Sequence, residues 1–199
     1  LSWINYEIAS KKKRLVEEPM YFKKLDELES LGFFIYLKEE NVKPERASIL
    51  KSLIGEKQLK GAGRITSIDL QDLGRKEGEL IYILEYLRPL LEKNGVKLGI
   101  LKVEINPQRS VFKLFSDNNT IFEISETDVN HDLSSEKIAI SFVAFLNKML
   151  RQNNSSEYVY LSEIDKDSDY CNIFLLTADL LDTVLGMKLE KTSKPNITK

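Results

Sequence analysis

The chain has 199 residues, 29 of them basic and 31 acidic, for a net charge of -2, and 42% of its residues are hydrophobic. This composition is typical of a folded globular protein, and the charge balance argues against nucleic-acid binding, which usually needs a basic excess. The chain has one histidine, His131, and one cysteine, Cys171. A Ser-His-Asp or Cys-His catalytic unit would have to use His131, and a structural zinc site needs about four Cys or His ligands. We therefore assign no catalytic, metal-binding or cofactor-binding residue, and the composition weighs against an enzyme.

The cysteine count also bears on the compartment. A lone cysteine cannot form an internal disulfide, which favours a reducing environment and a cytoplasmic location. No apolar run reaches the roughly 18 residues of a membrane span. The chain begins at Leu1 with aromatic residues ahead of a basic run at 11–14, an order that would suit the cytoplasmic flank of an upstream membrane anchor. A solvated basic turn on an amphipathic helix is the interpretation that we favour.

Helical patterns fill the start of the chain, and we expect a helical segment over residues 1–55. Its helices are predicted at residues 2–17, 20–31 and about 44–54. Pro19 ends the first pattern, and Gly32 stands where a helix C-terminus needs a left-handed residue. Pro44 suits the first turn of a helix. Residues 33–37 are apolar and aromatic, so they fit either a short buried strand or a connector between helices.

From about residue 60, strand patterns alternate with helical ones. Strands are predicted at residues 64–70, 97–105, 111–115, 120–124, 158–161 and 171–176. Helices are predicted at residues 79–94, 135–151 and between Thr177 and Gly186, and Pro89 should kink the first of these. The pattern indicates an α+β domain over 60–187, with one antiparallel sheet of about five to six strands and helices packed on it. Residues 188–199 form a polar tail that we expect to fray.

Two short motifs suggest ligand binding. Residues 60–64 hold two glycines between a lysine and an arginine, so backbone amides there could cradle a phosphate. The motif precedes a strand and lacks the Gly-Lys-Ser/Thr of phosphate loops, so a flexible connector is the interpretation that we favour. Asp165, Asp167 and Asp169 have the spacing of the first calcium-loop ligands, but Tyr170 stands where that loop needs glycine. A solvated hairpin tip is the better interpretation of these aspartates.

Acidic residues and tyrosines gather near the C-terminus. Seven acidic residues but a single lysine lie from Glu157 to Asp182. The residues that we predict to contact a partner are Asp165, Asp167, Asp169, Tyr158, Tyr160 and Tyr170. Tyrosine is enriched at protein interfaces, and an acidic surface would steer a basic partner. Ordinary solubilising charge is the alternative explanation.

Several short runs at helix ends and strand-to-helix junctions have a familiar pattern. They are Leu31-Gly32-Phe33-Phe34, Ile68-Asp69-Leu70-Gln71-Asp72-Leu73, Leu90-Leu91-Glu92-Lys93-Asn94-Gly95-Val96, Phe145-Leu146-Asn147, Ser156-Glu157-Tyr158-Val159-Tyr160 and Phe174-Leu175-Leu176-Thr177. The chain thereby resembles a group of uncharacterised bacterial α+β proteins, some of which are similar to cytoplasmic immunity partners of bacterial toxins. The resemblance covers most of residues 22–186 and implies no catalytic residue. Residues 1–18 depart from it.

The leading hypothesis from the sequence is a non-catalytic, protein-binding domain, possibly toxin-neutralising, whose partner is a basic protein and not a nucleic acid. The first alternative is a carboxylate-based enzyme or a domain that binds a metal or phosphate ligand at the acidic tip or the glycine loop. The second alternative is an accessory domain that a missing upstream segment tethers to a membrane.

Overall fold

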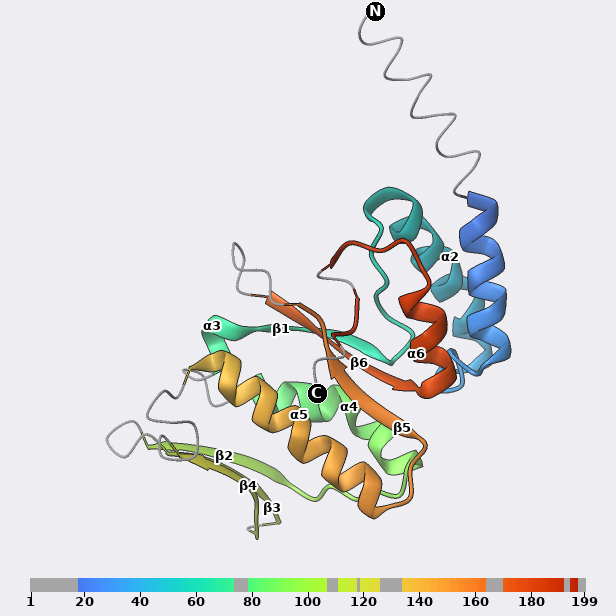
Figure 1. The fold of residues 1–199 in the computed structure, drawn as a ribbon. Coiled ribbons are helices and arrows are strands. Elements are labelled where there is room, and N and C mark those ends of the chain that lie inside the picture. The colour runs from blue at the N-terminus through green and yellow to red at the C-terminus, as the bar shows by residue number, and fades with distance from the viewer. Residues whose placement is uncertain are drawn as a thin grey trace, which may run out of the picture.

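The computed structural model describes residues 18–73, 79–106, 111–117, 119–125, 134–163, 170–191 and 194–196. Residues 18–30 are helical. The elements that follow are α2 (Glu39–Glu56), β1 (Ile65–Asp69), α3 (Leu70–Leu73), α4 (Glu79–Lys93), β2 (Leu101–Asn106), β3 (Val111–Ser116), β4 (Asn119–Ser125), α5 (Ser135–Gln152), β5 (Glu157–Leu161), β6 (Tyr170–Thr177) and α6 (Ala178–Leu185). Helices and antiparallel sheets stack in four layers (Figure 1), and the predicted α+β class is confirmed.

The six strands form two antiparallel sheets of three strands each, where we expected a single sheet. Sheet A has the order β1-β6-β5 and sheet B has the order β2-β3-β4. The separation arises because α4 and α5 lie between the sheets and bury apolar side chains against both. Phe122 of β4, for example, packs on Phe142 and Phe145 of α5 with ring centroids 5.8 and 5.2 Å away. A helix layer that is apolar on two sides can cover two sheets.

Strand β6 is the centre of the molecule. Cys171, Ile173 and Leu175 point toward α4 and α5, whereas Phe174 and Leu176 point toward the helix at 18–30, α2 and α6. Successive side chains on a strand point to opposite faces, so a continuous apolar run allows one strand to join two cores. Helices therefore cover both faces of sheet A.

The helix ends follow local sequence signals at three of the predicted places. Gly32 and Gly95 have φ values of +81° and +82°, and each follows a helix. Beyond them, Phe33 N–H donates to Leu28 O and Val96 N–H donates to Leu91 O, the bonds of a glycine-ended helix. The Thr177 hydroxyl accepts from Leu180 N–H at 3.3 Å and caps α6, as predicted.

Two predicted boundaries were wrong. Helix α2 begins at Glu39, so Pro44 lies in its second turn; the carbonyl that this proline leaves without a helical donor belongs to the exposed Glu40. Strand β2 begins at Leu101 and not near residue 97. The Gly99 backbone bonds to side chains instead, because its N–H donates to Ser116 Oγ and its carbonyl accepts from Arg88.

The remaining predictions concern residues 33–37, the proline in α4, the C-terminal segment and the start of the chain. Residues 33–37 form turns, so they are the connector and not a strand. Helix α4 continues through Pro89 to Lys93 without a break. Near the C-terminus, where we expected fraying, Pro195 is buried and forms an antiparallel bridge with Ser162. The predicted helix at 2–17 lies outside the described residues.

The outer edge of β5 is closed by a side chain of α5. The Asn147 carboxamide accepts from Val159 N–H at 2.7 Å and donates to Val159 O at 2.9 Å. It therefore makes both hydrogen bonds that a neighbouring strand would make at this position. An edge strand with open N–H and C=O groups invites pairing with other chains, and this contact blocks it.

We predict that Asn147→Asp lowers the free energy of unfolding by about 2 kcal/mol, because a carboxylate cannot donate to Val159 O and leaves that buried carbonyl unsatisfied. Urea denaturation measures the change. Asn153→Asp is the matched control, since the exposed Asn153 amide donates to the Met149 carbonyl within its own helix. An equal loss in both variants would show that Asn147 does not close the edge.

Candidate functional site

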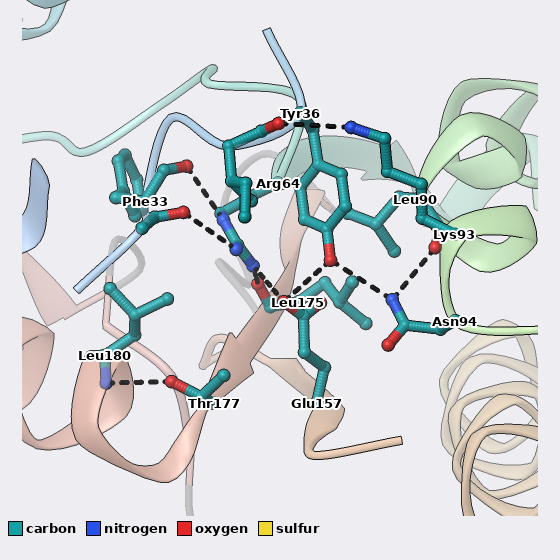
Figure 2. A network of polar contacts seen from close by, with 12 residues as sticks. Phe33, Tyr36, Arg64, Leu90, Lys93, Asn94, Glu157, Leu175, Thr177 and Leu180 are labelled. Atoms are coloured by element: carbon teal, nitrogen blue, oxygen red, sulfur yellow. Dashed lines mark hydrogen bonds and ion pairs between the residues drawn. The ribbon is translucent and has the colours of Figure 1, made fainter. Parts of the chain in front are cut away.

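The largest fully buried side chain of the described residues is a charged one, Arg64. It stands just before β1 with 1% of its surface exposed. Its guanidinium donates to the carbonyls of Phe33 (2.8 Å), Gly32 (3.1 Å) and Leu175 (3.0 Å). Figure 2 shows these bonds reaching from the turn after the first helix to strand β6. A buried cation is tolerated only where it is paired and hydrogen-bonded, and Arg64 meets both conditions.

The counter-charge of Arg64 is Glu157, the first residue of β5. The Glu157 carboxylate is 5% exposed, and its Oε1 atom lies 3.0 Å from Arg64 Nη1. Glu157 has the same strand parity as Val159, whose side chain belongs to the core between sheet A and α5. We had counted Glu157 among the acidic surface residues, and its burial corrects that count.

Tyr36 completes the site from the turn that follows the first helix. Its hydroxyl donates to Glu157 Oε1 at 2.8 Å and accepts from the Asn94 amide at 3.1 Å. The Arg64 guanidinium lies 4.5 Å from the centroid of the Tyr36 ring, and Lys93 Nζ lies 5.1 Å from it. Burial raises the pKa of Tyr36 to about 12, and the hydrogen bond to Glu157 adds to the effect.

A second polar chain connects the site to the end of α5. The Ser155 hydroxyl donates to Asn94 Oδ1 at 2.7 Å and accepts from Glu157 N–H at 2.9 Å. Asn94 also donates to Leu90 O at 2.9 Å, at the C-terminus of α4. The network therefore joins the turn after the first helix, the start of β1, β5, β6 and the end of α4, and Figure 2 shows its bonds around Arg64, Tyr36, Asn94 and Glu157.

The chemistry of this network is structural. Three of the four hydrogen bonds of the Arg64 side chain go to backbone carbonyls. The Tyr36 hydroxyl, whose pKa is raised from 10.0 to about 12, is even further from ionising at neutral pH than an ordinary tyrosine. The second oxygen of Glu157, Oε2, is buried without a hydrogen-bond partner among the described residues. A substrate would have no approach to a pair that is 1% and 5% exposed. We therefore assign the network to the stability of the fold.

The glycine loop that we considered for phosphate binding holds an internal carboxylate. Gly61, Ala62 and Gly63 have φ values of +92°, +58° and +67°, and Ala62 N–H donates to Glu45 Oε1 at 2.7 Å. The φ of Gly61 would strain any residue with a Cβ, and a Cβ there would also displace the Glu45 oxygen, from which it would stand 2.1 Å. The Ala62 amide is thus bonded to Glu45, and Arg64 is buried in the core, so two of the groups that could have held a phosphate are already engaged.

The tyrosines that we predicted as contact residues share one face of sheet A. Tyr158 and Tyr160 lie two residues apart on β5, opposite Leu176 and Phe174 of β6. Tyr170 has the same parity as Phe174 but lies at the far end of β6, four residues from Phe174 and six from Leu176, and thus roughly 13 to 20 Å from the positions of the other two tyrosines. The structure therefore brings Tyr158 and Tyr160 together and leaves Tyr170 apart.

Helix α6 places the carboxylate of Asp182 near Tyr160, and Asp179 precedes it by one helical turn. Burial raises the pKa of Tyr160, and the nearby Tyr158 and Asp182 raise it further. Asp179 and Asp182 are exposed on α6, and neither has an ion-pair partner within the described ranges. Tyr158 is 37% exposed, whereas Tyr160 packs on the core. We call Tyr158, Tyr160, Asp179 and Asp182 the tyrosine–aspartate surface.

The remaining candidate residues from the sequence are three aspartates, one histidine and one cysteine. Asp165, Asp167, Asp169 and His131 lie outside the described residues. Cys171 is buried, and burial raises the pKa of its thiol to about 12. In the part of the chain that the structure describes, no group of three or more His, Cys, Asp or Glu side chains could hold a metal ion. No helix there is long and apolar enough to cross a membrane.

We predict that Glu157→Gln lowers the free energy of unfolding by about 3 kcal/mol, because it leaves Arg64 as a buried cation without a counter-charge. Chemical denaturation measures the loss. Glu163→Gln, at an exposed glutamate of the same segment, should change stability by less than about 0.5 kcal/mol. If both variants lose the same amount, the buried pair does not hold the fold.

The raised pKa of Tyr36 predicts a pH dependence of stability at alkaline pH. The phenol titrates at 10.0 in the unfolded chain and at about 12 in the folded protein, so its contribution is complete below pH 10 and is lost as the pH rises toward 12. Urea unfolding of the wild type and of Tyr36→Phe across this range isolates the effect. The two stability curves should converge as the pH rises; a constant difference would contradict the prediction.

Comparison of the chain with known protein families, with curated proteins and with solved structures finds no match.

Proposed function

We propose that this chain is a protein-binding domain that recognises a basic partner through the tyrosine–aspartate surface. The observation that carries the proposal is the placement of two tyrosines of β5 beside an exposed carboxylate of α6. These residues come from different elements, and the fold sets them next to one another. The surface thus combines aromatic contact area with negative charge, a composition suited to a cationic protein.

The two tyrosines have different parts in this surface. Tyr160 packs on the core with its ring and is therefore held in place before a partner arrives. Tyr158 is 37% exposed and offers more area for a partner to cover. Tyrosine has few rotatable bonds, so ordering it at an interface costs little conformational entropy. Fixed aromatic anchors of this kind are frequent among residues that dominate binding energy.

The carboxylates would set the partner's charge and the speed of association. Asp179 and Asp182 are exposed, and among the described residues neither is neutralised by an ion pair. Glu163 is also exposed, at the end of β5, and Asp165, Asp167 and Asp169 follow it in the sequence. A surface of one charge sign attracts a partner of the opposite sign over about a Debye length, so binding should weaken at high salt.

The toxin-neutralising role that the sequence resemblance implies is part of this proposal. A domain of that kind acts by covering its partner and needs no catalytic group of its own. The competing phosphate-binding function has less support, since Glu45 occupies the Ala62 amide and Arg64 is engaged in the core.

We predict that the double variant Tyr158→Ala, Asp182→Lys loses a protein partner that the unmodified chain captures from a native lysate. Loss of the anchor ring and reversal of the charge should reduce partner recovery at least about tenfold. Quantitative mass spectrometry of the captured proteins, at low and high salt, measures the change.

The matched control is Tyr82→Ala, Glu104→Lys, which makes the same changes at an exposed tyrosine of α4 and an exposed glutamate of sheet B. Thermal unfolding verifies that both variants fold. Equal recovery of every partner by the unmodified chain, the variant and the control would contradict the proposed surface.

A further inference from the structure

The backbone N–H and C=O groups of β5 that face away from β6 are hydrogen-bonded in two different ways along the strand. At its start, Glu157 N–H donates to the Ser155 hydroxyl, and in its middle both groups of Val159 bond to Asn147. In both places the partner of the backbone is a side chain from the same domain. They leave no place for an added strand over the first half of β5.

At the end of β5 and just beyond it, the partner is the backbone of the C-terminal segment. Ser162 and Pro195 form an antiparallel bridge, and Asn196 N–H donates to Leu161 O. Residues 194–196 therefore lie along the edge of sheet A just beyond β5, held there by one isolated antiparallel bridge and one hydrogen bond. Continued by one residue, this antiparallel register places the backbone of Lys194 across from that of Glu163, and these two residues have opposite charges.

The segment that makes this bridge also contacts the fold through its first residues. Tyr21 donates to Lys188 O at 2.9 Å, Glu190 N–H donates to Lys57 O at 3.0 Å, and Leu189 packs on the core around α6. Beyond Lys191, Pro195 is buried and bridges Ser162, and Asn196 N–H donates to Leu161 O. The segment from residue 188 to 199 carries four lysines and one glutamate, so its charge is opposite to that of the β5 end.

We infer that the edge of β5 at Leu161–Glu163 is an acceptor for an extended, lysine-containing segment of the partner, and that residues 194–196 fill it in the free protein. The chain's own tail shows the chemistry that fits: antiparallel backbone pairing and a lysine across from Glu163. The inference rests on the proposed function in so far as the partner is a basic protein. It adds that an extended segment of that partner would pair with the edge of β5, by strand addition next to the tyrosine–aspartate surface.

The test uses a chain that ends at Lys191, which retains the contacts of residues 188–191, and a synthetic peptide with the sequence of residues 192–199. Titration is followed by NMR of the labelled chain. The shortened chain should bind the peptide saturably at roughly millimolar concentration or below, since a tethered segment has an effective concentration of about that size. The full chain should not bind it, because its own tail occupies the site.

The matched control peptide carries a methyl group on the backbone nitrogen of Asn196, which removes only the donor to Leu161 O. It should bind about tenfold more weakly. In case shortening impairs folding, the full chain with Asn196→Pro removes the same donor and should gain binding of the unmodified peptide.

The outcomes separate this inference from the proposed function. Absence of peptide binding to both altered chains, or equal binding of the methylated peptide, overturns the acceptor site, whatever the Tyr158→Ala, Asp182→Lys variant does. Peptide binding together with unchanged partner recovery by that variant supports the acceptor site and removes the tyrosine–aspartate surface.

Discussion

The buried guanidinium of Arg64 is the interaction on which the rest of the structure depends. Transferring a charge from water into a core costs several kcal/mol unless a counter-charge and hydrogen bonds replace the water. Arg64 obtains its bonds from three separate places in the chain: the turn at Gly32–Phe33, Leu175 of β6 and Glu157 of β5. It lies where the core around α6 meets the core around α4 and α5, so its bonds hold the two cores in one arrangement. The loop before it, with left-handed residues from Gly61 to Gly63, is fixed in turn by Glu45.

The same pair determines which face of sheet A displays the tyrosines. Glu157 is held against Arg64, so the next residue, Tyr158, must point to the opposite face. A shift of β5 by one residue would move every side chain of the strand to the other face and would take Glu157 away from Arg64. The buried ion pair thus helps to specify the register of an edge strand that pairs with another strand, β6, on one side only. The fold of the core and the composition of the surface are consequences of one constraint.

Much of the fold can be predicted from the sequence, because local signals mark many of its boundaries. Gly32 and Gly95 take the left-handed conformation that ends a helix, and Thr177 caps α6. The division of the strands into two sheets could not be predicted, since it depends on helices whose opposite faces cover different sheets. Strand periodicity did contain a signal for the site. Arg64 falls on the same face as Thr66 and Ile68, and Glu157 falls on the same face as Val159 and Leu161. Counting the charges of the whole segment obscures this signal, because the count treats the buried Glu157 like the exposed acidic residues.

The most direct test of the central claim is hydrogen exchange at the Arg64 side chain itself, measured by NMR on the Nε–H group of the labelled protein. This proton donates to Phe33 O at 2.8 Å in a site that is 1% exposed. It should exchange only when the molecule unfolds as a whole, with a protection that falls together with global stability as denaturant is added. Exchange at the rate of an exposed arginine, or through a local opening that denaturant does not affect, would contradict the role given to Arg64.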